Sequence, residues 1–416
     1  MTGLRRRAGV TFSSLAIPNY RRWFVGQTVS QSGTWMQALA QGWLVLTLTG
    51  SATWLGVVVA LQFVPTLLLG PYGGLLVDRH DTRRVLAVTQ LALAAQAVAL
   101  GLLVLTGQVV LWMVLALALV QGLLQVVEQP ARQALVRELV PPDAVRNAVG
   151  LNSVVMNASR AVGPAVGGVL IAVVGVGICF LLNAVSYVVV LVALLRMDRS
   201  AMSPSPVQVR APGQLREGFA YVRRTPVVLS VLVMMALVGM LTYEFAVTLP
   251  ALVRTTFASG PATLGWLSAA MGAGAVVAGL WSAARRTTGL HQFAAAAVAF
   301  GLAVLGVAVA PTVPLAAVGM VAVGAASVAF ASTGNSTLQL TAAPHMRGRV
   351  MALWGMAVFG TTPIGGPLVG LVAEHLGPRW ALGLGSVAAL AAAGLGALAV
   401  ARIRERRPEI AVVVRA

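Results

Sequence analysis

The chain has 416 residues, of which 58% are hydrophobic and only 10% are charged, and this balance excludes an ordinary water-soluble globular protein. Its formal net charge of +18 comes from 29 basic residues, all of them arginine, against 11 acidic ones. The arginines occur in short clusters between apolar runs, which is typical of membrane-protein loops and does not predict nucleic-acid binding.

Twelve apolar runs, each long enough to cross a bilayer as a helix, follow one another along the chain. The first six cover residues 20–48, 54–77, 84–106, 109–131, 144–173 and 176–196. The other six cover residues 226–253, 262–284, 291–310, 313–340, 347–373 and 379–403. Because the runs lack the period-2 alternation of a membrane β-barrel, we predict an all-α integral membrane protein with twelve transmembrane helices.

A polar segment rich in proline, serine and arginine, at 197–225, separates two predicted six-helix bundles, at 20–196 and 226–403. If the N-terminus is cytoplasmic, the loop arginines are cytoplasmic except for Arg254 and Arg379. The positive-inside rule therefore predicts a protein of the cytoplasmic membrane whose linker and terminal tails, 1–19 and 404–416, are cytoplasmic. The first residues carry arginine but no short apolar core with a cleavage site, so we expect a retained tail and no signal peptide.

Two short motifs occur once in each half, at offsets of a little over 200 residues. Gly50-Ser-Ala-Thr-Trp-Leu-Gly56 recurs as Gly260-Pro-Ala-Thr-Leu-Gly265, and Gly163-Pro-Ala-Val-Gly-Gly168 has a counterpart at 363–370. Parallel repeats of this size predict two pseudo-symmetric bundles around a central cavity.

The loop after the second run reads Gly-Leu-Leu-Val-Asp-Arg-His-Asp-Thr-Arg-Arg and resembles the signature loop of the major facilitator superfamily. The matching residues are Gly74, Asp78, Arg79, Arg83 and Arg84, while Asp81 stands where that family usually has Gly. The resemblance implies a cytoplasmic gate in which Asp and Arg bond helix termini of the opposite half; a simple positive-inside anchor is the alternative. The equivalent loop of the second half, ending in Arg285 and Arg286, has lost the acid.

The fifth run is similar to the antiporter motif of the superfamily, in which glycines allow helices five and eight to pack closely. The residues that fit are Gly150, Gly163, Pro164, Gly167 and Gly168, with Ser159 in place of one expected Gly. Small residues at this spacing favour close helix packing whatever the function. In the fourth run Ala118 occupies the position of an arginine found in many proton-coupled exporters, so that motif does not imply proton coupling here.

Further motifs resemble the transmembrane secretion effector branch, which is related to the enterobactin exporter. They are Glu128-Gln-Pro-Ala-Arg132, Asn147-Ala-Val-Gly-Leu-Asn152, Asn183-Ala-Val-Ser-Tyr187 and Arg347-Gly-Arg-Val350. This resemblance implies export of drugs, siderophores or other secondary metabolites by alternating access.

Three charged residues are candidates for positions within the bilayer, where a charge is energetically costly. Glu128 is four residues before Arg132, a spacing that allows a helical ion pair. Arg160 lies midway through its helix, and we expect Glu128 or backbone carbonyls as its partner. Glu244, beside Tyr243, is predicted to bind a proton or a cationic substrate because desolvation disfavours its charged form; the alternative is a carboxyl group in the external vestibule.

Amide side chains recur in runs one, four and ten, which line the cavity in the superfamily. Candidates for contact with a polar substrate are Gln31, Gln125, Asn335 and Gln339, and interhelical hydrogen bonding is the alternative reading.

We predict a monomeric exporter that exchanges a small molecule for protons. An importer of the same fold and a non-transporting receptor or regulatory protein remain alternatives. The four histidines are scattered, without metal spacing or a shared catalytic loop, so we expect no enzyme, no metal and no cofactor.

Overall fold

The computed structural model describes residues 13–202, 214–284 and 288–413. The predicted N-terminal tail, linker, second gate loop and C-terminal tail therefore lie partly outside the described residues. Every one of the twelve predicted runs is helical, which confirms the all-helical membrane fold.

The first half begins with a short 3-10 helix, η1 (Ser13–Ala16), and continues with six long helices. These are α2 (Pro18–Thr49), α3 (Ala52–Arg79), α4 (Thr82–Leu105), α5 (Leu111–Glu138), α6 (Val145–Val174) and α7 (Val176–Leu195). A helix that was not predicted, α8 (Gln214–Arg224), then forms inside the segment expected to be a linker.

The second half contains more helices than expected because two of the predicted runs are broken. Its helices are α9 (Pro226–Leu241), α10 (Phe245–Ala251), the π-helix η2 (Leu252–Thr256), α11 (Pro261–Ala284), α12 (Leu290–Ala308), α13 (Val313–Thr341), α14 (Arg347–Phe359), α15 (Thr362–His375) and α16 (Pro378–Val413). The run at 226–253 breaks after Leu241 and the run at 347–373 breaks after Phe359, whereas α16 continues past the expected end at 403.

In the described part of the chain, eleven helical segments are long and apolar enough to cross a membrane. The first predicted helix, α2, has 32 residues but is not among them. Its interior carries the amides of Gln27, Gln31, Gln37 and Gln41, which lower its hydropathy without interrupting the helix.

The chain divides into two compact units that do not coincide with the two halves of the sequence. Unit 1 comprises residues 1–50, 61–209 and 260–269, and unit 2 comprises 51–60, 210–259 and 270–416. The first turns of α3 thus pack in unit 2, and the first turns of α11 pack in unit 1. The predicted bundles at 20–196 and 226–403 therefore each give a short segment to the other unit.

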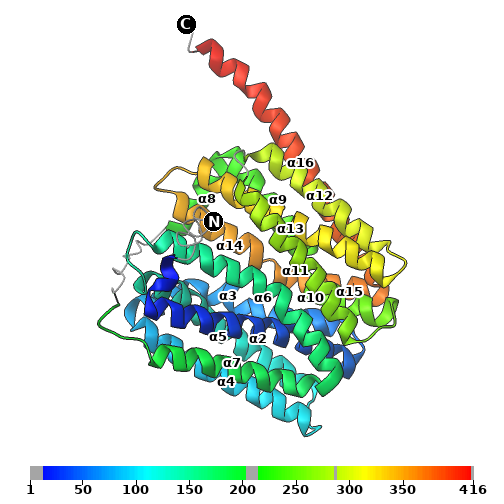
Figure 1. Cartoon of the computed structure of the whole chain (residues 1–416). Helices are drawn as coiled ribbons and strands as arrows, with labels where there is room; N and C mark the ends of the chain where they lie inside the picture. Colours follow the sequence, from blue (N-terminus) through cyan, green and yellow to red (C-terminus); the bar gives the residue numbers. More distant parts are fainter. Residues whose placement is uncertain (1–12, 203–213, 285–287, 414–416) are drawn as a thin grey trace, which may run out of the picture. The chain divides into compact units, whose positions relative to one another are not determined.

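Within each unit the helices pack in long pairs (Figure 1). In unit 1, α4 lies beside α7, and α2 packs against both α6 and α7. In unit 2, α12 packs against α13 and α16, and α9 against α14 and α16.

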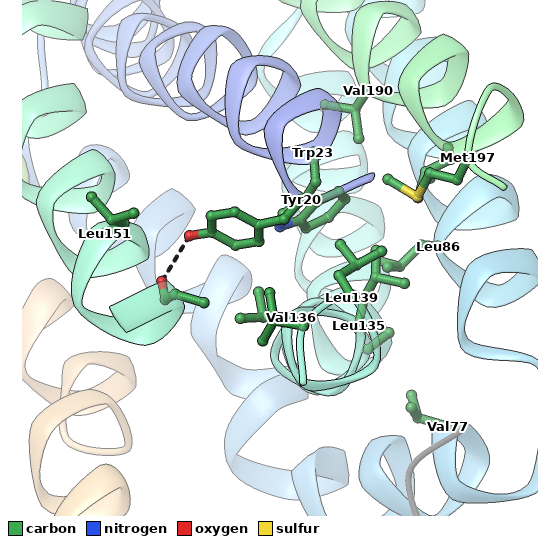
Figure 2. Packing of buried hydrophobic residues seen from close by; sticks show 14 residues of the cluster. Tyr20, Trp23, Val77, Leu86, Leu135, Val136, Leu139, Leu151, Val190 and Met197 are labelled. Carbon is green, nitrogen blue, oxygen red and sulfur yellow. Dashed lines mark hydrogen bonds between the residues drawn. The ribbon is translucent and has the colours of Figure 1, made fainter. Parts of the chain in front are cut away.

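A buried cluster joins one end of α2 to its neighbours in unit 1 (Figure 2). Tyr20 and Trp23 are each 1% exposed and pack among Leu86, Leu135 and other apolar side chains of α4, α5 and α7. The Tyr20 hydroxyl donates a hydrogen bond of 2.8 Å to the Ala148 carbonyl of α6. This cluster fixes the helix ends next to the α3–α4 loop, where the gate motif lies.

Candidate functional site

The gate motif stabilises helix ends within unit 1. Asp81 caps α4, because its Oδ1 accepts a hydrogen bond of 2.9 Å from the Arg84 backbone N–H. The Arg83 guanidinium donates to the carbonyls of Leu195 and Met197, at 2.8 and 3.3 Å, and so caps the C-terminal end of α7. In the described residues Arg83 thus bonds α7 of its own half of the chain, and the gate toward the opposite half stays a prediction.

The other gate residues lie around this cap. Gly74 is buried in the last turns of α3, Asp78 is half-buried, and Arg79 and Arg84 are exposed. In the described part of the chain the ion pairs are Arg132–Glu128 and Arg349–Glu217, so the structure gives Asp78 no ion pair there.

The glycines of α6 allow close contacts, although on two different neighbours. A Cβ on Gly163 would lie 2.5 Å from the Ser32 carbonyl oxygen of α2, and one on Gly167 would lie 3.1 Å from Met36. A Cβ on Gly168 would lie 2.6 Å from the Gly265 Cα of α11. The contact expected between the fifth and eighth runs, which are α6 and α11, is made by Gly168, whereas Gly163 and Gly167 pack against α2.

Two further motif residues differ in their packing. The Pro164 carbonyl lies 2.8 Å from the position of a Cβ on Gly265, so it belongs to the α6–α11 contact. Gly150 differs from the other glycines of the motif, because no described atom would lie within 4 Å of a Cβ there. The start of α6 is open at this position.

The two internal repeats meet crosswise. The 260–265 motif packs on the 163–168 motif in unit 1, through Gly265 and Gly168. In unit 2 the 50–56 motif packs on the 363–370 motif: a Cβ on Gly56 would touch the Gly366 carbonyl, and one on Gly370 would lie 2.6 Å from the Ala52 carbonyl. Each copy of one repeat therefore meets the copy of the other repeat from the opposite half.

Glu374, which the sequence did not indicate, reinforces one of these crossings. Its carboxylate lies at the end of α15 and accepts a short hydrogen bond from the Ser51 hydroxyl and one of 3.0 Å from the Thr53 backbone N–H. Glu374 thus caps the N-terminus of α3, where an anion is favoured by the unpaired N–H groups and the helix dipole.

The buried amides of unit 1 bond to one another between helices. Asn183 of α7 donates a hydrogen bond of 2.7 Å to Gln37 of α2. Gln37 in turn donates a hydrogen bond of 3.3 Å to Gln96 of α4. Gln62 of α3 donates to both Gln41 and Gln121, each at 3.2 Å. These amides therefore hold helices together, as the alternative reading proposed.

The four amides predicted to contact a substrate are less deeply buried. Gln31 donates a hydrogen bond of 3.4 Å to Gln27, one turn earlier in α2, and Gln339 donates one of 2.5 Å to Asn335 within α13. Gln125 is half-buried. The two bonded pairs lie within single helices, so these two hydrogen bonds do not connect neighbouring helices.

The charged residues of α5 and α6 have separate partners. Glu128 Oε1 lies 3.8 Å from Arg132 Nε, and the two residues are 8% and 9% exposed. The Arg160 guanidinium lies over the Trp35 ring, 4.9 Å from its centroid, which is a cation–π contact. An aromatic face was not among the partners expected for Arg160.

Glu244 lies at the break between α9 and α10, where helical hydrogen bonding is interrupted. The residue is 3% exposed, and its Oε1 has no hydrogen-bond partner among the residues that the structure describes. A Cβ added to Gly365 of α15 would touch the Met240 carbonyl and lie 3.0 Å from Oε1. The Thr362 hydroxyl approaches the same carboxyl group from the first turn of α15. A carboxylate, a carbonyl and a hydroxyl thus gather where two helix breaks meet.

Tyr243 points to a different set of helices. Its hydroxyl donates a hydrogen bond of 2.7 Å to the Ser327 carbonyl of α13, and its ring centroid lies 5.1 Å from that of Phe300 of α12. Phe245 lies 6.2 Å from the same ring. The break therefore has an aromatic wall next to the carboxyl group.

Residues 9–411 match the model of the family described as transmembrane secretion effector, a branch of the major facilitator superfamily. The chain belongs to this family. It is therefore a multi-pass membrane transporter and not an enzyme.

Two relatives of this chain carry names that state a transport function. The multidrug efflux pump Tap of Mycolicibacterium fortuitum is 27% identical over 83% of this chain and 87% of that protein. The staphyloferrin A transporter of Staphylococcus aureus is 31% identical, but over only 37% of this chain and 39% of that transporter.

The fold of this chain is also found among solved structures. A bacterial homologue of the human lysosomal transporter Spinster, in an inward-facing and occupied conformation, matches with a TM-score of 0.73 at 14% identity. The match covers 92% of this chain and 96% of that one, and at this identity it establishes the fold alone.

Proposed function

We propose that this transporter exports a small molecule, a drug, siderophore or other secondary metabolite, across the cytoplasmic membrane in exchange for protons. In this proposal both termini and the linker are cytoplasmic, and a single chain is the transporting unit. The similarity to an efflux pump along most of the chain supports export, and the shorter similarity to a staphyloferrin A transporter supports a siderophore as one substrate class.

The observation that carries proton coupling is the unpartnered carboxyl oxygen of Glu244. Glu244 is only 3% exposed, so protonation removes a charge that is buried away from solvent. The protonated carboxyl group can also donate a hydrogen bond, whereas the unprotonated oxygen has no donor among the described residues to accept from. The Met240 carbonyl, which like Oε1 lies close to the position of a Cβ on Gly365, is the proposed acceptor. A carboxyl group that alternates between these two forms can carry a proton in each transport cycle.

The position of Glu244 supports coupling of the proton to the conformational cycle. The carboxyl group lies beside a crossing between two interrupted helices. The Met240 carbonyl, before the first break, lies close to the same point on Gly365, and the Thr362 hydroxyl, after the second break, bonds the carboxyl group. Interrupted helices occur at ion sites of secondary transporters because the backbone there has free carbonyl groups. Binding or release of a proton at this crossing changes the hydrogen bonding of both breaks.

Alternating access is supported by how the repeats touch. At Gly56 and at Gly168 the atoms nearest to an added Cβ are backbone atoms of the neighbouring helix. Surfaces of this kind can separate and close again without rotamer changes, as a rocking movement requires.

The experiment that tests export uses two preparations of membrane vesicles from cells that express the transporter. Inverted vesicles should take up ethidium or a labelled macrolide when respiration acidifies their interior, and the uptake should stop when an uncoupler removes the gradient. Uptake only by right-side-out vesicles would identify an importer instead. Absence of flux for every compound of a drug and siderophore panel would favour a receptor.

A further inference from the structure

One face of α8 packs against other residues of unit 2. The Glu217 carboxylate pairs with the Arg349 guanidinium of α14 at 2.6 Å, and the Tyr221 hydroxyl accepts a hydrogen bond of 3.0 Å from the Ala343 backbone N–H. A Cβ on Gly218 would lie 3.4 Å from the Arg349 side chain, and Val222 is 5% exposed. The helix is therefore a docked part of unit 2 and not a free linker.

The opposite face of α8 is exposed and carries both apolar and basic side chains. Phe219 is 51% exposed, and Arg223, one helical turn later, is exposed on the same face. Ala220 and Arg224 are exposed beside them. No described side chain pairs with either arginine, and the face has no covering element within the part of the chain that the structure describes.

The location of this face indicates what covers it. α8 ends at Arg224, and the membrane-spanning segment begins at Pro226, so only Thr225 separates them. A helix so close to the start of a span lies at the level of the lipid headgroups. There an aromatic ring enters the acyl boundary, and arginines bind lipid phosphates.

We propose that the Phe219–Arg223 face of α8 is a binding site for anionic phospholipid headgroups. The aromatic ring supplies apolar contact, and Arg223 and Arg224 supply the charge that distinguishes an anionic from a zwitterionic lipid. Because Glu217 pairs with Arg349, lipid bound to the exposed face of α8 also influences the first turn of α14, to which the docked face of α8 is attached. This site is independent of the exported substrate and of proton coupling.

The test reads the polarity at α8 itself. The chain has one cysteine, Cys179, so a Cys179→Ala background accepts a bimane label through Ala220→Cys on the exposed face. In nanodiscs, bimane emission should shift to the blue as phosphatidylglycerol replaces phosphatidylcholine. Each basic residue near an anionic surface raises the affinity for anionic lipid roughly fivefold. The double variant Arg223→Gln and Arg224→Gln should therefore lower the affinity for phosphatidylglycerol, measured by the bimane shift, on the order of 10- to 30-fold.

Two controls separate this site from general effects of charge. Arg146→Gln removes an exposed arginine at the start of α6 and should leave the bimane response unchanged. Phe219→Ala should reduce the shift while keeping the preference for anionic lipid. The proposal is overturned if phosphatidylglycerol causes no shift, or if the double arginine variant responds as the unchanged protein does.

Discussion

A single methyl group at the contact between α6 and α11 should destabilise unit 1. In Gly168→Ala the new Cβ would lie 2.6 Å from the Gly265 Cα and 2.7 Å from the Pro261 carbonyl oxygen. Both are backbone atoms, so no flexible side chain can yield and the two helices must separate. Overpacking of this kind costs about 1–3 kcal/mol, and the better helix propensity of alanine returns up to about 1 kcal/mol. We therefore expect a net loss of about 1–2 kcal/mol.

The chain offers a matched control for this substitution in the same helix. A Cβ on Gly150 would have no described atom within 4 Å, so Gly150→Ala should be neutral or slightly stabilising. Cys179, buried on α7 in the same unit, reacts with a thiol-reactive dye only after unfolding and is a built-in reporter. Gly168→Ala should melt about 2–8 °C below the unchanged protein, because 1 kcal/mol corresponds to about 2–4 °C in a domain of this size. Equal melting temperatures for both glycine variants would refute the close contact.

Three other substitutions test single interactions. Asp81→Ala removes the cap of α4 and should cost about 1 kcal/mol in the thiol-dye assay, whereas Asp81→Asn should cost little. Glu374→Ala removes the acceptor for the Thr53 N–H, so hydrogen exchange in the first turn of α3 should accelerate roughly tenfold, and unchanged exchange would show that the cap is unimportant. Glu128→Gln leaves Arg132 buried without its counter-ion and should cost about 3 kcal/mol, much of which a second change, Arg132→Gln, should restore in an unfolding assay.

The order of the helices was predictable from hydropathy because the bilayer requires long apolar runs with internally satisfied backbones. Because hydropathy is averaged over windows as long as a whole span, it did not reveal the two helix breaks. The break after Phe359 has a local signal in Gly360-Thr361-Thr362-Pro363, since glycine and proline both weaken helices. The break at Glu244 has no such signal: Thr242, Tyr243 and Glu244 are ordinary helix residues, and tertiary contacts decide it.

The contacts of the candidate site were predictable only where they are local. Glu128 and Arg132 lie together because four residues complete one helical turn. Glu374 and Ser51 are 323 residues apart, and nothing within one sequence indicates that they meet. The repeats at 50–56 and 260–265 were recognisable, but periodicity cannot say that each packs against the other repeat of the opposite half.

The proposed exchange of substrate for protons at Glu244 is tested most directly with purified protein in liposomes. Under an imposed pH gradient the unchanged transporter should accumulate ethidium, whereas Glu244→Gln should not, because glutamine cannot release a proton. With ethidium on both sides and no gradient, Glu244→Gln should still exchange label, since in the proposed mechanism Glu244 carries the proton and not the substrate. Gradient-driven accumulation by Glu244→Gln at the rate of the unchanged protein would contradict the account.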